Sequence, residues 1–186
     1  MSQPSRAGFV LVGGRSSRMG RDKALLAFDG ATLVESIATK VERACGDVAL
    51  IGPPERYGAL GLRVIPDRIP GAGPMGGLYT ALDQSPAEWN LIVACDMPDL
   101  SPDLFEDLFC AAADSAFDCV VAGFERRIHP LCAVYHRRAA APALRAINRK
   151  QLKMQDFVSS LHSSIWPVAD AALLSNINTP IEWSTR

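Results

Sequence analysis

The five consecutive apolar residues at 91–95, LIVAC, constrain the fold of this chain more than any other feature. A strand that is apolar at successive positions has both faces buried, which is typical of a central strand in a parallel sheet. Residues 9–12, FVLV, form a second run of this kind near the N-terminus. Parallel strands are joined by helical crossovers, so these runs predict a sheet with helices packed on its faces.

Strand-like and helical segments alternate along the rest of the chain, as such a sheet requires. Strands are predicted at residues 9–12, 48–51, 62–65, 91–95, 119–122, 131–135 and 165–168, and helices at 32–45, 76–84, 138–147 and 150–161. Thr32 and Glu35 form the pattern of a capping box, and Gly46 is a typical helix end. Ser101 followed by Pro102 predicts another helix start.

Length and composition agree with one folded unit. The 186 residues are enough to bury a sizeable core, and 48% of them are hydrophobic. The sequence contains no repeat, no low-complexity segment and no linker. The expected fold is therefore α/β: a single domain spanning residues 1–186, with a doubly wound, mostly parallel sheet and helices on both faces.

The charge balance excludes several classes of partner. The chain has 19 Lys and Arg against 20 Asp and Glu, which is not the balance of a nucleic-acid or membrane-surface protein. No segment reaches the roughly 18 apolar residues that a membrane-spanning helix needs. The five cysteines are odd in number and form no C-x-x-C pair, so we expect reduced thiols in a cytoplasmic protein with a small-molecule partner.

One loop departs from this even balance of charge. Residues 15–23, RSSRMGRDK, contain four cations and one acid directly after Gly13 and Gly14. Glycine lets backbone N–H groups face an anion, and Arg15, Arg18 and Lys23 can form charge-assisted hydrogen bonds to phosphate oxygens. The loop therefore predicts a polyphosphate ligand; the alternative is a solvated loop whose cations pair with nearby acids. It does not match the P-loop pattern G-x-x-x-x-G-K-[ST].

Two aspartates stand where strands of the predicted sheet end, which is the usual place for a ligand in open α/β sheets. Asp96 directly follows the apolar run at 91–95, and we expect its carboxylate to hold a Mg²⁺ ion that also binds substrate phosphates. The alternative is an aspartate that caps a turn or a helix. Asp67 follows the strand at 62–65 and either contacts the nucleotide or caps a turn with Arg68.

Three further motifs have no single interpretation. Residues 71–76, GAGPMG, match G-x-G-x-x-G, but no strand leads directly into them and Pro74 has no N–H to offer. They indicate a loop over a flat ring or a tight turn. His129 either lines an acceptor pocket or is structural. Asn176 and Asn178 place two amides on one face of an extended segment, unless this segment is a turn before a last short helix.

Four stretches, in this order, resemble the molybdenum cofactor guanylyltransferases, a bacterial family of nucleotidyltransferases that links GMP to molybdopterin. They are residues 11–23 (LVGGRSSRMGRDK), 73–78 (GPMGGL), 95–98 (CDMP) and 176–180 (NINTP). The likeness covers nearly the whole chain. The first stretch alone indicates only the wider nucleotidyltransferase group, whereas the combination is much more specific.

The resemblance implies a Rossmann-like nucleotidyltransferase fold and a set of site residues. Substrate-binding roles fall to Leu11, Val12, Gly13, Gly14, Lys23, Asp67, Gly76, Asp96, Asn176 and Asn178. The catalytic set would be Arg18 and Lys23, on the triphosphate, with Asp96 as the Mg²⁺ ligand. Asn176 and Asn178 would lie near the molybdopterin or the metal, and the loop that contains Gly76 would help to enclose the guanine.

Two positions differ from the pattern of the family. The family usually has Ala where this chain has Val12, a bulkier and stiffer residue. Relatives often carry an Asn that contacts the base or ribose after the second strand, where this chain has Gly52 and Pro53. Both differences concern the guanine contacts and leave nucleotidyl transfer as the expected chemistry.

The reaction that the resemblance implies transfers GMP from GTP to the phosphate of molybdenum-loaded molybdopterin and releases pyrophosphate, with Mg²⁺ as cofactor. The nearest alternatives are a CTP-dependent molybdopterin cytidylyltransferase and a sugar-phosphate nucleotidyltransferase. An alternative of another class is a non-catalytic carrier of the nucleotide or of molybdopterin. We also expect proteins of the molybdenum cofactor pathway, acceptor molybdoenzymes or their chaperones as partners, because so labile a cofactor is poorly suited to free diffusion.

Overall fold

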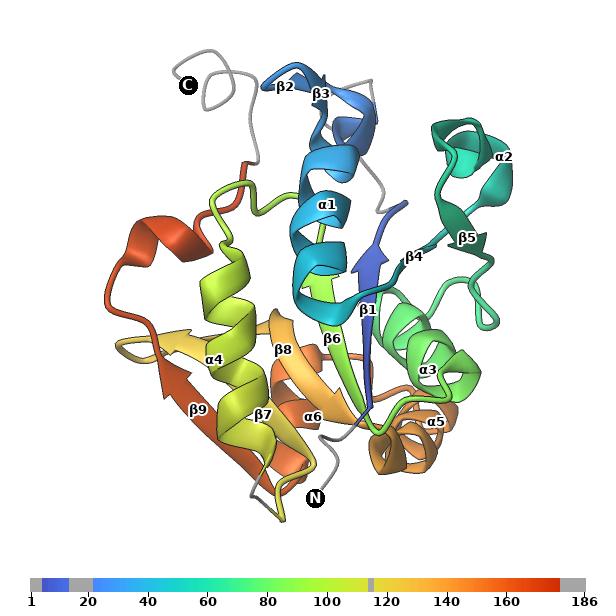
Figure 1. The fold of residues 1–186 in the computed structure, drawn as a ribbon. Coiled ribbons are helices and arrows are strands. Elements are labelled where there is room, and N and C mark those ends of the chain that lie inside the picture. Colours follow the sequence, from blue (N-terminus) through green and yellow to red (C-terminus); the bar gives the residue numbers. More distant parts are fainter. Residues whose placement is uncertain (1–4, 14–21, 114–115, 178–186) are drawn as a thin grey trace.

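One mixed sheet organises the fold. The computed structural model describes residues 5–13, 22–113 and 116–177. Seven strands form the sheet in the order β5-β4-β1-β6-β8-β7-β9 (Figure 1). Their bounds are β1 Arg6–Leu11, β4 Val48–Ile51, β5 Arg63–Ile65, β6 Trp89–Ala94, β7 Cys119–Phe124, β8 Arg127–His136 and β9 Ser163–Pro167. All neighbours are parallel except those of β8, so the mostly parallel sheet is confirmed.

Strand β8 is antiparallel to β6 and β7 because a very short turn connects it to β7. Only residues 125 and 126 separate the two strands, and Glu125 has the positive φ, 52°, that tight hairpin turns use. Such a short connection can join only antiparallel strands. The chain therefore returns between β6 and β7 and brings residues of β8 beside the central strand.

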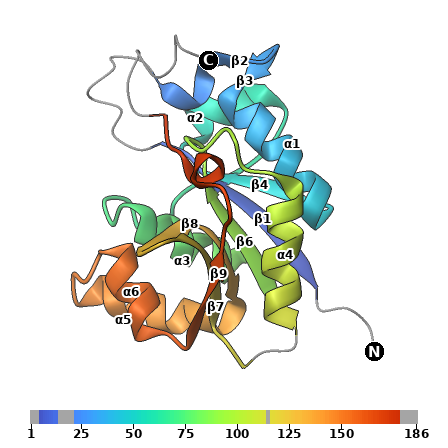
Figure 2. The same cartoon turned by 90° about the vertical axis from the view of Figure 1, so that its left-hand side faces the viewer.

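Helices cover both faces of the sheet, as predicted (Figure 2). Helices α1 (Leu33–Cys45) and α4 (Pro102–Ala113) pack on one face, and α3 (Pro74–Gln84), α5 (Ala140–Asn148) and α6 (Met154–Ser160) on the other. Leu91 and Val93 belong to the core on the α1 side, whereas Ile92 belongs to the core on the α3 side. Both faces of β6 are therefore buried. In the described part of the chain, no helix has the length and apolar character needed to cross a membrane.

Helix α1 begins and ends where the sequence predicts. The backbone N–H of Thr32 donates to Oε2 of Glu35 at 2.8 Å, and the N–H of Glu35 donates to Oγ1 of Thr32 at 3.4 Å. These two bonds form the expected capping box. At the other end, Gly46 adopts the left-handed conformation with φ 77°, which ends the helix without the steric cost of a side chain.

Some boundaries differ from the prediction. The helix predicted over 150–161 begins only at Met154, since Lys150 has φ 59° and residues 150–153 form a turn and an extended segment. The strand predicted at 131–135 is longer, from Arg127 to His136. Several short elements were not predicted: η1 (Lys23–Leu25), β2 (Ala27–Phe28), β3 (Ala31–Thr32), α2 (Pro54–Tyr57), η2 (Gly58–Leu60), η3 (Arg137–Ala139) and η4 (Ala171–Leu174).

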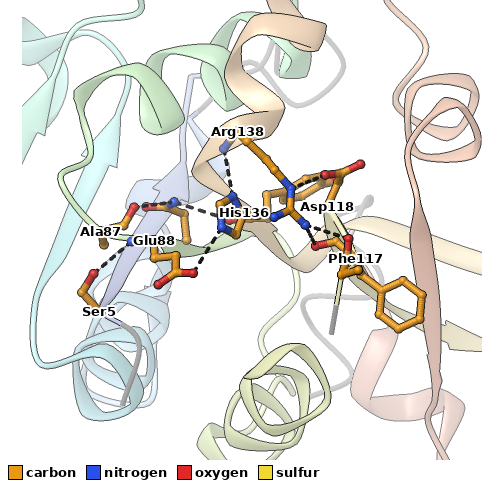
Figure 3. Close-up of polar contacts among 10 residues, drawn as sticks. Ser5, Ala87, Glu88, Phe117, Asp118, His136 and Arg138 are labelled. Carbon is orange, nitrogen blue, oxygen red and sulfur yellow. Dashed lines mark hydrogen bonds and ion pairs between the residues drawn. The ribbon is translucent and has the colours of Figure 1, made fainter. Parts of the chain in front are cut away.

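A polar network joins the strands at the edge of the sheet where β6, β7 and β9 begin (Figure 3). Nδ1 of His136 accepts a hydrogen bond from the backbone N–H of Arg138 at 3.0 Å, and its Nε2 lies 3.3 Å from Oε1 of Glu88. The guanidinium of Arg138 binds Oδ1 of Asp118 at 2.5 Å. These bonds tie the strands together at the end of the sheet opposite to the carboxyl ends of β1, β4 and β6.

Candidate active site

A cavity of about 1090 Å³ lies beyond the carboxyl ends of β1, β4, β5 and β6. Its walls are the last residues of these strands with the segments that follow them, the start of α3, the segment 22–24 and Leu131 of β8. The carboxyl ends of parallel strands are the usual ligand site of open α/β sheets. The sequence pattern therefore located the cavity correctly.

Asp96 stands two residues after the end of β6 and lines this cavity. Its Oδ1 is buried and has no hydrogen-bond partner among the described residues. Burial raises the pKa of this carboxyl, and the ammonium of Lys23 opposes that shift. A buried carboxylate oxygen without a partner is costly to maintain, so the arrangement indicates a ligand that supplies positive charge.

Lys23 is held close to Asp96 by the segment that ends the described chain. Nζ of Lys23 donates to the carbonyl oxygen of Ile177 at 3.3 Å. The backbone N–H of Ile177 in turn donates to the carbonyl oxygen of Asp96 at 2.8 Å. The two residues that the sequence assigns to catalysis in this region therefore share one cavity wall.

Asp22, the residue before Lys23, anchors this cation. Its Oδ1 accepts a hydrogen bond from the backbone N–H of Ala24 at 3.1 Å and thereby caps the turn η1. Its Oδ2 accepts a hydrogen bond from the hydroxyl of Tyr57 at 2.7 Å. Arg56 is further away, with Nη1 at 3.9 Å from Oδ2. Nothing in the sequence pattern pointed to Tyr57, because its partner lies 35 positions away in the chain.

Asp67 lines the cavity and also holds the loop before α3. Its Oδ1 accepts hydrogen bonds from the backbone N–H of Ile69 at 2.9 Å and from Oγ1 of Thr80 at 3.1 Å. Oγ1 of Thr80 also accepts a hydrogen bond from the backbone N–H of Arg68 at 3.0 Å, so these bonds join the turn at 67–69 to helix α3. Oδ1 of Asp67 therefore caps a turn, which is one of the two roles that the sequence allowed. A contact between Asp67 and the nucleotide stays a prediction.

The glycines of the loop 71–76 serve two different purposes. Gly73, with φ 59°, precedes Pro74 at the first position of α3, and both residues line the cavity. Gly76 is buried behind that wall, and a Cβ there would lie 2.7 Å from the carbonyl oxygen of Ile69 and 2.9 Å from Oδ2 of Asp67. The chain turns tightly at the start of the loop, where the N–H of Ala72 donates to the carbonyl oxygen of Ile69 at 3.2 Å, and the packing of the loop over a flat ring stays a prediction. A contact between Gly76 and the guanine stays a prediction, whereas its neighbour Gly77 does line the cavity.

The two positions that differ from the family pattern lie against each other. Val12 and Gly52 both line the cavity, and a Cβ on Gly52 would lie 2.6 Å from Cγ2 of Val12. Gly13 has φ 93°, and a Cβ there would lie 3.0 Å from Cδ of Pro53. The larger side chain at Val12 therefore occupies the space that Gly52 leaves free.

A second cavity, of about 440 Å³, lies beside the first. Arg127 and His129 of β8 line it together with Asn176. Asn176 is followed by Ile177, whose carbonyl oxygen accepts a hydrogen bond from Lys23 and whose N–H donates to the carbonyl oxygen of Asp96, and both Lys23 and Asp96 line the first cavity. Burial, and then the charge of Arg127, lowers the pKa of His129. The two cavities are therefore connected through residues 176 and 177.

The residues assigned from the sequence fall into four groups. Those that line the larger cavity are Leu11, Val12, Gly13, Lys23, Asp67 and Asp96. Asn176 lines the smaller cavity and Gly76 neither of the two. Gly14, Arg18 and Asn178 lie outside the described residues. Asp22, Tyr57 and Arg127 belong to none of the motifs that point to the site, although Asp22 stands within the cationic loop.

A cavity at the carboxyl ends of parallel strands, with a lysine beside a buried carboxylate, defines an α/β protein that binds a nucleotide or another polyphosphate. The chain matches the model of the MobA-like NTP transferase domain over residues 8–164. This match covers most of the chain. The protein belongs to the MobA-like NTP transferase family.

Individual relatives agree with this family. A protein of Flavobacterium johnsoniae, named probable molybdenum cofactor guanylyltransferase, is 34% identical over 94% of this chain and 92% of its own. A protein of the same name from Pelotomaculum thermopropionicum is 34% identical over 93% of this chain and 87% of its own. In fold, molybdopterin-guanine dinucleotide biosynthesis protein A from Archaeoglobus fulgidus superposes with a TM-score of 0.83 at 24% identity, over 96% of this chain and 95% of that one.

Proposed function

We propose that this protein is a molybdenum cofactor guanylyltransferase, acting as one nucleotidyltransferase domain. It transfers GMP from GTP to the phosphate of molybdenum-loaded molybdopterin, forms molybdopterin guanine dinucleotide and releases pyrophosphate. The relatives that share most of its length carry this name. The observation that supports the proposal best is the unpartnered carboxylate oxygen of Asp96, which lies in the same cavity as Lys23.

The cavity suits a Mg²⁺ ion bound chiefly by the substrate. The described residues hold no group of three or more His, Cys, Asp or Glu side chains that could form a metal cage. Mg²⁺ is usually held by one or two carboxylates together with substrate phosphates and water. Asp96 would be the protein ligand, and the bound ion would neutralise charge on the phosphates during transfer.

The reaction needs no protein base to activate the nucleophile. A phosphate monoester has a second pKa of about 6, so the acceptor phosphate is largely ionised at neutral pH. Its oxygen attacks the α-phosphorus of GTP, the new P–O bond forms, and the bond from the α-phosphorus to its bridging oxygen breaks. Pyrophosphate leaves with that electron pair. Lys23 and Arg18 hold the triphosphate in line and balance its charge, which is the main task of the protein in such transfers.

The smaller cavity is the place that we assign to the acceptor. Its volume of about 440 Å³ is in the usual range for small-molecule sites. Arg127 offers a cation and Asn176 an amide, which suit a phosphate and a pterin ring. Because Asn176 of this cavity precedes Ile177, which is hydrogen-bonded to Lys23 and Asp96 of the larger one, an acceptor bound here would lie next to the α-phosphate of GTP.

We also propose where and with which proteins it works. All five cysteines are free, which supports a reducing compartment such as the cytoplasm. Proteins that supply molybdopterin, and acceptor molybdoenzymes or their chaperones, are the expected protein partners. Their identification in a pull-down with the intact protein tests this part of the proposal.

Pyrophosphate release tests the function directly. The purified protein is supplied with molybdenum-loaded molybdopterin, Mg²⁺ and, in separate reactions, GTP, CTP or ATP. Release with GTP alone is the expected result. Release with CTP instead would keep the mechanism and contradict the guanine assignment. Nucleotide binding without release from any of the three would contradict the transferase proposal and favour a carrier or another acceptor.

A further inference from the structure

Tyr57 is a buried tyrosine close to the larger cavity, and the proposed mechanism gives it no role. It ends the short helix α2, and its side chain is 0% exposed. Its hydroxyl donates to Oδ2 of Asp22 at 2.7 Å. Burial, and then the hydrogen bond to Asp22, raises the pKa of Tyr57, so the hydroxyl remains a proton donor at neutral pH.

The partner of Tyr57 is engaged on both sides. Oδ1 of Asp22 caps the turn η1, which begins at Lys23, and Oδ2 receives the hydroxyl of Tyr57. Asp22 therefore joins the turn that carries Lys23 to helix α2. Because hydrogen bonds to a carboxylate are stronger than those between neutral groups, the bond from Tyr57 should restrict the movement of Asp22 and of the turn that carries Lys23.

The same helix follows directly from the wall of the larger cavity. Residues 52–55 line that cavity and run into Tyr57. A Cβ on Gly52 would lie 3.4 Å from Cε2 of Tyr57, so the ring also lies against the backbone of the wall. A shift of residues 52–55 on nucleotide binding would therefore act on Asp22 and Lys23 through Tyr57.

We propose that Tyr57 is a positioning residue, whose hydroxyl acts through Asp22 to hold Lys23 in place for the phosphates of the nucleotide. The inference depends on the proposed function, because it takes Lys23 as a phosphate-binding residue. Tyr57 does not itself touch the substrate in this scheme. Its effect on phosphate binding should therefore disappear when Lys23 can no longer contribute.

A double-mutant cycle tests this dependence. The binding of inorganic tripolyphosphate with Mg²⁺, measured by calorimetry, is compared in the wild type, Tyr57→Phe, Lys23→Met and the double variant. Tyr57→Phe keeps the buried ring and removes only the hydroxyl. We expect it to weaken binding by about 3-fold to about 30-fold, and to have almost no further effect in the Lys23→Met protein. Tyr79→Phe, which loses a hydroxyl on the outer side of α3 near Asp83, is the matched control and should bind like the wild type.

The outcomes separate the inference from the proposed function. Additive losses in the double variant, or wild-type binding by Tyr57→Phe, would overturn the positioning role and leave the phosphate site intact. Wild-type binding by Lys23→Met would overturn both. Melting temperatures of all variants, measured in the same buffer, show whether any loss of binding comes from loss of the fold.

Discussion

Among single residues, two carboxylates of the larger cavity differ in what surrounds them. Both oxygens of Asp22 accept hydrogen bonds, from Ala24 and from Tyr57. Oδ1 of Asp96 is buried without a partner among the described residues. An oxygen that is already satisfied is suited to holding structure, whereas an unsatisfied one is suited to holding a ligand.

The close contact between Gly52 and Val12 also has a testable consequence for stability. A Cβ on Gly52 would lie 2.6 Å from Cγ2 and 3.0 Å from the carbonyl oxygen of Val12. We expect Gly52→Ala to lower the free energy of unfolding by about 1–3 kcal/mol, which is typical of an overpacked site. Val12→Ala in the same chain should recover part of this loss. Urea unfolding measures both, and equal losses in the single and the double variant would contradict the contact.

At the scale of elements, the junction between α3 and the turn 67–69 determines one wall of the cavity. A Cβ on Gly76 would lie 2.7 Å from the backbone carbonyl oxygen of Ile69, which cannot move alone. Gly76→Ala should therefore shift α3, lower the stability by about 1–3 kcal/mol and raise the KM for GTP more than it lowers kcat. Thermal unfolding and steady-state kinetics test this. An unchanged KM at wild-type stability would show that the junction tolerates a side chain.

The network at the opposite edge of the sheet makes the stability depend on pH. Burial, and then the charge of Arg138, lowers the pKa of His136 below its usual 6.5, while Glu88 opposes the shift. The hydrogen bond from Arg138 to His136 requires the neutral imidazole, because its Nδ1 accepts the backbone N–H of Arg138 and cannot do so when it is protonated. As the pH falls below 6.5, the imidazole is protonated in the unfolded chain before it is protonated in the folded protein. The contribution of His136 to the free energy of unfolding is therefore complete above pH 6.5 and is lost as the pH falls further.

We therefore expect the free energy of unfolding to decrease from pH 7 towards pH 5. His136→Asn keeps an acceptor for the N–H of Arg138 but does not titrate, so its stability should fall less steeply over this range. Urea unfolding at a series of pH values gives both slopes. The same slope in the two proteins would contradict the role of His136. His129, whose pKa is also lowered, titrates in both and cancels in the comparison.

At the scale of the whole molecule, the alternation of apolar and helical segments was enough to predict the sheet and its two helical layers. Both faces of β6 are buried, as its apolar run Leu91, Ile92 and Val93 predicts, and Asn90 is a buried polar residue beside that run. The antiparallel course of β8 was not predicted, because its turn at Glu125 and Arg126 lacks the glycine or asparagine that usually signals a tight hairpin. The four-residue helix α2 is too short to have a periodicity of its own.

Only those residues of the candidate site that belong to local sequence patterns could be predicted. Asp96 and Lys23 stand next to sequence features that are local, an apolar strand and a run of cations. Tyr57 is important only through a partner that the fold brings to it, and no spacing in the sequence reveals such a contact. The smaller cavity also depends on the tertiary arrangement, since the hairpin of β7 and β8 and the segment around Asn176 line it together.

The central claim is that the buried, unpartnered oxygen of Asp96 serves catalysis and not stability, and Asp96→Asn tests it most directly. The substitution keeps the size of the side chain and removes its charge. We expect Mg²⁺-dependent pyrophosphate release with GTP and molybdopterin to fall by at least about 100-fold. The melting temperature should stay equal or rise, because burial disfavours the charged carboxylate. Release close to that of the wild type, or a clear loss of stability, would contradict the claim.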